Sequence, residues 1–283
     1  MNTTRKNMLP ILLLTLTATS LQAATITWIG RGGDGFWSTP ANWDANKVPE
    51  SSDDVIITNG SVNYVAGRDL SIGSGCTMLV GAGGSFVQTG TDSWIRLDGN
   101  VVVQKGGVFD SGSAGQLHLT GSFTLEPGGT LIRHEKNLNA GAAWLFNGGT
   151  VDLGMGEFQF RTTVDFAGVL YAGQMAPQDG EAILNFTGGH IFLRDSRKDS
   201  FFQPGAACLN FPLKSTGIVS ITNCTPEAVY SRYFEGNTPR MRYNGEPVSV
   251  ANFPNLIGVE KSSSMENGVD IFIRVKNRMS SFP

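Results

Sequence analysis

The stretch Gly106–Leu131, GGVFDSGSAGQLHLTGSFTLEPGGTL, decides the fold because it begins and ends with the same pattern. A glycine pair, one variable residue and a large apolar residue form "GGVF" at its start and "GGTL" at its end. Between them, "QLHLTGSFTLE" alternates apolar and polar residues, which is typical of β-strands and not of helices. The stretch therefore reads as one repeat of a structure built from short strands.

The same glycine pattern recurs along most of the chain, at steps of 19 to 24 residues. It occurs at Gly60-Ser61-Val62, Gly84-Ser85-Phe86, Gly107-Val108-Phe109, Gly129-Thr130-Leu131, Gly149-Thr150-Val151, Gly168-Val169-Leu170 and Gly189-His190-Ile191. A period near twenty is typical of solenoids, because each unit buries its apolar face only when a neighbour stacks on it. We predict an all-β, single-stranded right-handed parallel β-helix. An all-β sandwich is the alternative, although it gives no reason for the period.

The glycine pattern also predicts which side chains fill the interior of the solenoid. The apolar residue two positions after each glycine should stack on its equivalent in the next coil. The expected ladder is Val62, Phe86, Phe109, Leu131, Val151, Leu170 and Ile191.

Both ends of the chain depart from the repeat. Residues 1–23 carry Arg5 and Lys6, a short apolar run and small residues, which predicts a signal peptide and an exported protein, extracellular, at the cell surface or periplasmic. Residues 24–57 are expected to form an N-terminal cap, and residues 58–203 the repeats. Residues 204–283 are expected to form a last coil at Gly217-Ile218-Val219 and a C-terminal cap, with a β-hairpin that turns at Asn267-Gly268.

The stretch Gly33–Trp43, GDGFWSTPANW, supplies two of three tryptophans, Trp28, Trp37 and Trp43, just ahead of the first repeat. A solenoid exposes apolar interior and strand edges at its first coil, so these rings are expected to form a lid. Asp34 and Asn42 are then expected to hydrogen-bond turn amides, as is Asp53-Asp54 where the first strand begins. A carbohydrate-binding platform made of Trp37 and Trp43 is the alternative.

The residues Thr27–Ile57 resemble the opening of the exported bacterial β-solenoid proteins related to the autotransporter-associated β-strand repeat family. The matching elements are Trp28, Gly30, Asp34, Trp37, Asn42, Trp43, Pro49, Asp53 and Asp54. The resemblance implies an extracellular or envelope protein with a right-handed β-helix, usually without an assigned catalytic activity. The chain differs from that family in being short and in lacking a translocator barrel or an obvious sorting tail.

Four acidic residues are the candidates for catalysis on a solenoid face. Counting from the anchoring glycines places Asp110 and Asp152 in one row, and Glu126 and Asp165 in another, each pair two coils apart. At a strand spacing of roughly 4.8 Å this is about 9.6 Å, near the upper limit for an inverting glycosidase pair. Turn-capping or solvated roles are the alternative for all four.

The sequence contains only isolated features that bear on disulfides, histidine sites, metals and other ligands. A Cys208–Cys224 disulfide is possible in an exported protein, and Cys76 is expected to be a small buried residue. His118, His134 and His190 are interpreted as surface residues without a common site, and "RDSRKDS", 194–200, as a solvated loop. The sequence predicts no metal site and no cofactor, and calcium only as an isolated structural ion. It also predicts no transmembrane segment, and with a net charge of -3 no nucleic-acid partner. The sequence makes no prediction of the oligomeric state or of anchoring at a surface.

These features predict an exported, non-enzymatic β-solenoid that acts as a structural or adhesive module, with a glycan or envelope component as the partner. The alternatives are a polysaccharide-active enzyme, either a lyase or an inverting hydrolase, and a carbohydrate-binding module that uses the N-terminal tryptophans.

Overall fold

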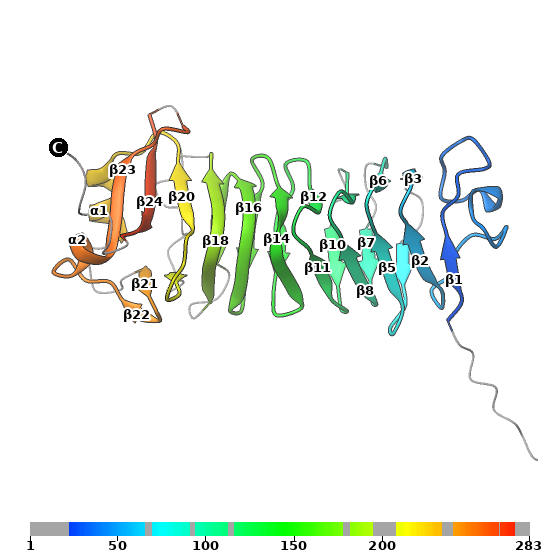
Figure 1. Cartoon of the computed structure of the whole chain (residues 1–283), viewed down its shortest axis with the longest axis horizontal. Coiled ribbons are helices and arrows are strands. Elements are labelled where there is room, and N and C mark those ends of the chain that lie inside the picture. The colour runs from blue at the N-terminus through cyan, green and yellow to red at the C-terminus, as the bar shows by residue number, and fades with distance from the viewer. Residues whose placement is uncertain are drawn as a thin grey trace, which may run out of the picture.

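The computed structural model describes residues 23–65, 70–90, 94–112, 116–177, 182–194, 208–233, 240–265 and 267–274. It is an elongated parallel β-solenoid, with the N-terminal strands at one end of the rod and β23 and β24 at the other (Figure 1). Each strand of the regular part pairs in parallel with its equivalent one coil away. The predicted β-solenoid is confirmed, and the sandwich alternative is wrong.

Three faces make up each regular coil. The first face holds β2 (Asp54–Ile57), β5 (Thr77–Val80), β8 (Asn100–Val103), β11 (Phe123–Leu125), the first parts of β14 (Trp144–Asp152), β16 (Val164–Ala172) and β18 (Ile183–Leu193), and then β19 (Cys208–Phe211) and β21 (Met241–Tyr243). The second face holds β3 (Gly60–Tyr64), β6 (Gly84–Gln88), β9 (Val108–Asp110), β12 (Thr130–Ile132), the second parts of β14, β16 and β18, and then β20 (Ile218–Ile221). The third face holds β4 (Leu70–Ile72), β7 (Trp94–Leu97), β10 (Gln116–Leu119), β13 (Leu138–Ala140), β15 (Glu157–Phe160) and β17 (Gln174–Pro177).

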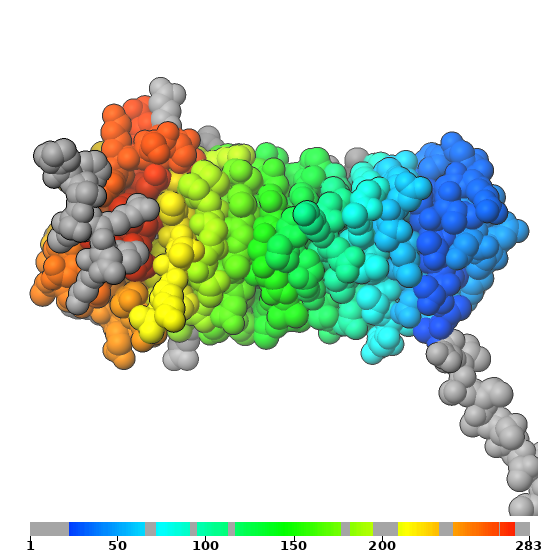
Figure 2. Space-filling model, viewed as in Figure 1, coloured from blue at the N-terminus to red at the C-terminus, as the bar shows by residue number. Residues whose placement is uncertain are grey.

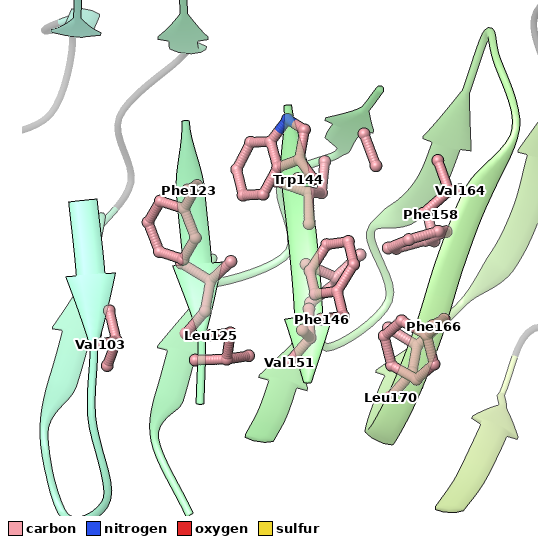
Figure 3. Close-up of a cluster of buried hydrophobic side chains, with 14 of the residues drawn as sticks. Val103, Phe123, Leu125, Trp144, Phe146, Val151, Phe158, Val164, Phe166 and Leu170 are labelled. Carbon is pink, nitrogen blue, oxygen red and sulfur yellow. The ribbon is translucent and has the colours of Figure 1, made fainter. Parts of the chain in front are cut away.

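The predicted interior ladder runs the length of the second face. Each member pairs with the next in register, from Val62 opposite Phe86 to Leu170 opposite Ile191, and all seven side chains have 0% exposure. Val219 continues the ladder opposite Ile191, as expected for a last coil. Figure 3 shows how side chains of the first face, such as Phe146 and Phe166, meet the ladder residues Val151 and Leu170 inside the rod. Apolar burial along this axis is the main force that holds the coils together.

The third face is interrupted, whereas the other two are continuous. β4, β7 and β10 form one three-stranded sheet, and β13, β15 and β17 form another. A physical reason lies at the corner that leads back to the first face. Gly99 and Gly121 stack there so closely that a Cβ on Gly121 would lie 1.8 Å from the carbonyl oxygen of Gly99. The equivalent residue in the next coil is Ala142, whose Cβ cannot accept this stacking.

The corner that enters the third face also changes at this coil. The amide of Lys136 donates to the carbonyl of Arg133 at 3.0 Å, and the amide of Gly156 donates to the carbonyl of Leu153 at 2.8 Å. The two coils therefore share one turn geometry, and β13 stacks on β15 in register from Leu138 opposite Phe158. The third face thus resumes one coil later as a separate sheet.

The N-terminal cap consists of β1 (Thr25–Thr27), which pairs in parallel with β2, and a folded loop that contains the 3-10 helix η1 (Pro40–Asn42). Trp28, Trp37 and Trp43 are buried in it, with 4%, 6% and 1% exposure. Trp37 also contacts the interior ring of Phe86, at 6.0 Å between centroids. The space-filling view shows this segment closing the N-terminal end of the rod (Figure 2).

The cap loop is held by the predicted polar side chains. Asp34 Oδ1 accepts from the amide of Phe36 at 3.0 Å, and Asn42 Oδ1 accepts from the amide of Gly32 at 2.7 Å. The hydrogen bond from the Thr39 hydroxyl, followed by those from Phe36 and Asn42, lowers the pKa of Asp34. Asp53 and Asp54 likewise accept from backbone amides.

The C-terminal end is closed by elements that run against the solenoid pattern. The predicted hairpin is formed by β23 (Ile257–Lys261) and β24 (Val269–Ile273), and β24 pairs antiparallel with β20. The short strand β22 (Glu246–Pro247) folds back on β21, and the helices α1 (Pro226–Tyr233) and α2 (Phe253–Leu256) contact β23. The sequence analysis did not predict the helix α1. No helix in the described ranges is both long and apolar enough to cross a membrane.

Replacement of Gly189 by alanine is expected to destabilise the rod. Gly189 has φ +101° and pairs with Gly168, and a Cβ on it would lie 1.9 Å from the carbonyl oxygen of Gly168. Backbone strain and overpacking together predict a loss of about 2–4 kcal/mol of unfolding free energy. Gly141→Ala is the matched control, because the nearest neighbour of its Cβ would be Thr162 Oγ1, at an ordinary contact distance of 3.8 Å. Chemical denaturation of both variants measures the difference, and equal midpoints would contradict the register of these strands.

Candidate functional site

Asp110 and Asp152 lie in one outward row of the second face, as predicted, with Ile132 between them. Each carboxylate accepts a hydrogen bond from the backbone amide two residues later in the chain. Asp110 Oδ1 accepts from the amide of Gly112 at 2.8 Å, and Asp152 Oδ1 accepts from the amide of Gly154 at 2.9 Å. Each carboxylate therefore caps the turn after its own strand, which is the alternative that the sequence left open.

Glu126 and Asp165 do not share a row, so the predicted pairing is wrong. Glu126 follows the inward Leu125, whereas Asp165 precedes the inward Phe166, and Leu125 and Phe166 occupy the same row through Phe146. The error arises because the turn between the first and second faces varies in length. Leu125 lies four residues before its anchoring glycine, but Phe166 lies only two before Gly168.

The two carboxylates also lie in separate surface hollows. Glu126 lines an open hollow of about 700 Å³ and Asp165 one of about 450 Å³. Asn147 Nδ2 donates to Glu126 at 3.3 Å, and Asn185 Nδ2 donates to Asp165 at 2.7 Å. The arrangement does not bring this pair to the two sides of one substrate.

The tryptophans of the N-terminal cap contact one another edge to face. The centroid of Trp43 lies 5.0 Å from that of Trp28 and 4.8 Å from that of Trp37. Trp43 Nε1 donates to the carbonyl of Trp37 at 2.8 Å. A sugar platform needs an exposed ring face, and the burial of Trp37 and Trp43 leaves none. The structure therefore favours the lid over the carbohydrate-binding interpretation.

An aromatic stack that the sequence analysis missed lies outside the second face. Tyr171 and Phe192, on neighbouring coils, stack at 4.9 Å, and the ring of His190 stacks on Phe192 at 3.8 Å. Arg194 Cζ lies 4.8 Å from the centroid of Tyr171. Because these groups cover one another's faces, the stack reinforces the rod and is not an open binding platform.

His190 also belongs to a polar link to the C-terminal cap. Its Nε2 lies 2.5 Å from the hydroxyl of Ser220, which donates to Asp270 Oδ1 at 2.5 Å. Burial lowers the pKa of His190, and the charge of Asp270 opposes that shift. The order differs from a nucleophile triad, in which histidine lies between serine and carboxylate, and Ser220 is fully buried. The link joins β18, β20 and β24.

The remaining predicted residues are placed as follows. Cys76 is buried, which raises the pKa of its thiol, in agreement with the expected structural role. The Cys208 side chain and residues 195–200 lie outside the described residues, so the disulfide and the predicted solvated loop, 194–200, stay predictions. His134 is not isolated: its Nε2 lies 3.0 Å from Asp110 Oδ2 on the neighbouring coil. Within the described ranges, no group of three or more His, Cys, Asp or Glu side chains could hold a metal ion.

A groove lies where the third face is interrupted, between β10 and β13. It has a volume of about 800 Å³, within the range of ligand-binding pockets. Its lining comes from both edges and from the corner residues: Leu117, His118, Leu119, Arg133, Glu135–Trp144, Gln159 and Arg161. None of the four acidic residues predicted as catalytic candidates lines it. It is a hollow in which polar and charged side chains from several coils converge.

Arg133 is the unusual residue of this groove. It occupies an inward position, in a row where the neighbouring coils place Ser111 and Leu153, and it is 2% exposed. Its Nη1 donates to Ser111 Oγ at 3.1 Å, its Nη2 donates to the carbonyl of Asn137 at 2.9 Å, and its Nε has no partner. Burial lowers the pKa of Arg133 to about 10, so the guanidinium remains charged at neutral pH.

The sequence analysis missed this site, although one signal was present. The position two residues after each ladder residue also points inward. It holds Tyr64, Gln88 and Ser111 in the coils before Arg133, and Leu153, Ala172, Leu193 and Ile221 in the coils after it. Arg133 is the one charged residue of that row, and the repeat alone can reveal it. The interruption of the third face beside Arg133 depends on the geometry of the corners, and the sequence analysis did not predict it.

Comparisons of the chain with protein-family models, with curated proteins and with solved structures found no match.

Proposed function

We propose that this protein is an exported, non-enzymatic β-solenoid that acts as a structural or adhesive module in the cell envelope or outside the cell. Its partner is a glycan or another envelope component, and the groove between β10 and β13 is its contact site. The signal-peptide pattern at the N-terminus supports export.

The observation that carries the proposal is where the four carboxylates predicted as catalytic candidates lie and what they bind. Asp110 and Asp152 cap backbone turns, and Glu126 and Asp165 lie in different rows and different hollows. A glycosidase needs two carboxyl groups that face one bond from opposite sides. A rod with covered ends and a groove lined by converging polar groups suits binding better than bond cleavage.

The competing function is a polysaccharide-active enzyme, and one experiment separates the two. The mature protein is incubated with a panel of polysaccharides, and reducing ends and unsaturated uronates are measured alongside retention on immobilised polysaccharide. We expect retention without product release. An Asp110→Asn/Asp152→Asn variant serves as the control, with binding expected to be unchanged. Product formation by the parent protein would contradict the proposal, and its loss in this variant would assign the chemistry to Asp110 and Asp152.

A further inference from the structure

The groove between β10 and β13 is locally positive in a protein whose net charge is negative. Arg133, Lys136 and Arg161 line it, together with His118, against the single lining carboxylate of Glu135. That carboxylate is already engaged, because Glu135 Oε2 accepts from the amide of Met155 at 2.7 Å. The chain as a whole carries a formal charge of -3. The excess of positive charge is therefore a property of this groove and not of the surface in general.

Arg133 has no acidic partner among the residues that the structure describes. The ion pairs among the described residues join Lys47 to Asp53, Arg96 to Asp98 and His134 to Asp110. Its guanidinium is nine-tenths buried and donates hydrogen bonds only to a hydroxyl and a carbonyl oxygen. The Nε has no hydrogen-bond partner among the described residues. A buried cation without an anion is costly unless something compensates its charge. An anion in the groove would supply that compensation, and Lys136 and Arg161 would make direct contacts at its rim.

The neutral part of the lining indicates what else the ligand carries. Asn139 and Gln159 stand opposite each other on β13 and β15. Asn139 is exposed, and Gln159 Nε2 already donates to Glu157 Oε2 at 2.7 Å, which leaves the Gln159 side-chain oxygen as an acceptor. Gly141, Ala142 and Ala143 also line the groove. Side-chain amides pair well with hydroxyl groups, and a lining that includes small residues leaves room for a sugar ring.

We propose that this groove binds a carboxylate-bearing saccharide, with the carboxylate in the field of Arg133, Lys136 and Arg161 and the hydroxyls on Asn139 and on the side-chain oxygen of Gln159. This assignment rests on the proposed function, since it names the ligand class of the same contact site.

The test uses titration calorimetry of the full-length mature protein with a hexuronate trisaccharide and with the same trisaccharide after reduction of its carboxyl groups. We expect saturable binding of the acidic form and at least a tenfold loss for the reduced form. Lys136→Ala/Arg161→Ala removes two charges at the rim and should weaken binding at least tenfold. Lys105→Ala removes an exposed charge from the turn between β8 and β9 and should leave binding within twofold.

Arg133→Met tests the buried charge separately. Methionine suits a buried inward position beside Leu153, so this variant is expected to melt at or above the parent temperature while it binds the acidic trisaccharide at least tenfold more weakly. If Arg133→Met fails to fold, the rim variant alone decides the question.

Several results would overturn the assignment. These are equal affinity for the acidic and reduced trisaccharides, full binding by the rim variant, tighter binding of an oligoglutamate peptide, and equal binding of inorganic phosphate or sulfate. If such a result accompanies retention on immobilised polysaccharide without product release, the proposed function stands and only this ligand class falls. Product release would instead remove the proposed function.

Discussion

Phe109→Asp is expected to abolish folding. Phe109 has 0% exposure and lies at the centre of the interior, stacked on Phe86 at 4.9 Å and edge-on to Phe123 at 5.5 Å. Loss of the ring costs about 3–5 kcal/mol, and an unpaired buried carboxylate adds several more. The sum is comparable to the whole stability of a domain, about 5–15 kcal/mol. Far-UV circular dichroism and thermal melting of the purified variant would measure the loss.

The neighbouring residue supplies the control for this experiment. Val108 belongs to the same strand but points outward, between Ser85 and Thr130 of the adjacent coils. Val108→Asp is therefore expected to fold and to melt near the parent. A Phe109→Asp protein with a native spectrum and an unchanged melting temperature would show that the ladder is assigned wrongly.

Removal of a cap tryptophan has the second largest expected effect. Trp43 is 1% exposed, contacts Trp28 and Trp37, and donates a buried hydrogen bond to the Trp37 carbonyl. Trp43→Ala should lower the unfolding free energy by about 3–5 kcal/mol, and Trp37→Ala should have a similar effect. Because the cap covers the first coil, the variants should also aggregate through the uncovered strand edge. Denaturant titration and light scattering measure the two effects.

Phe36→Ala is the comparison for the cap, since Phe36 lies in the same loop and is 40% exposed. It should change the unfolding free energy by less than about 1 kcal/mol. If the tryptophan variants melt like the parent and instead lose retention on immobilised polysaccharide, the cap rings are a binding site and the lid interpretation is wrong.

The ladder could be predicted from the sequence because it depends on a local and repeated feature. The short spacing from each glycine to its apolar partner, as in Gly107 to Phe109, is the same in every coil, so stacking follows from counting. The prediction that Glu126 and Asp165 share a row was wrong, because the count from each anchoring glycine crosses a turn whose length changes between coils. A count that spans a variable turn loses register, and a shift of one residue moves a side chain to the other side of the sheet.

The sequence by itself determined the solenoid, its interior ladder and the aromatic cap, because period, alternation and clustered tryptophans are properties of contiguous residues. Only the tertiary structure decided the groove. It requires that Ala142, which stands where the two preceding coils have Gly99 and Gly121, interrupt the third face, and that Arg133 and Lys136 of one turn converge with Arg161 of the next coil. Charge convergence of this kind depends on the distance between coils and on how each corner closes. Those quantities follow from the packing of the assembled rod and from no single stretch of the chain.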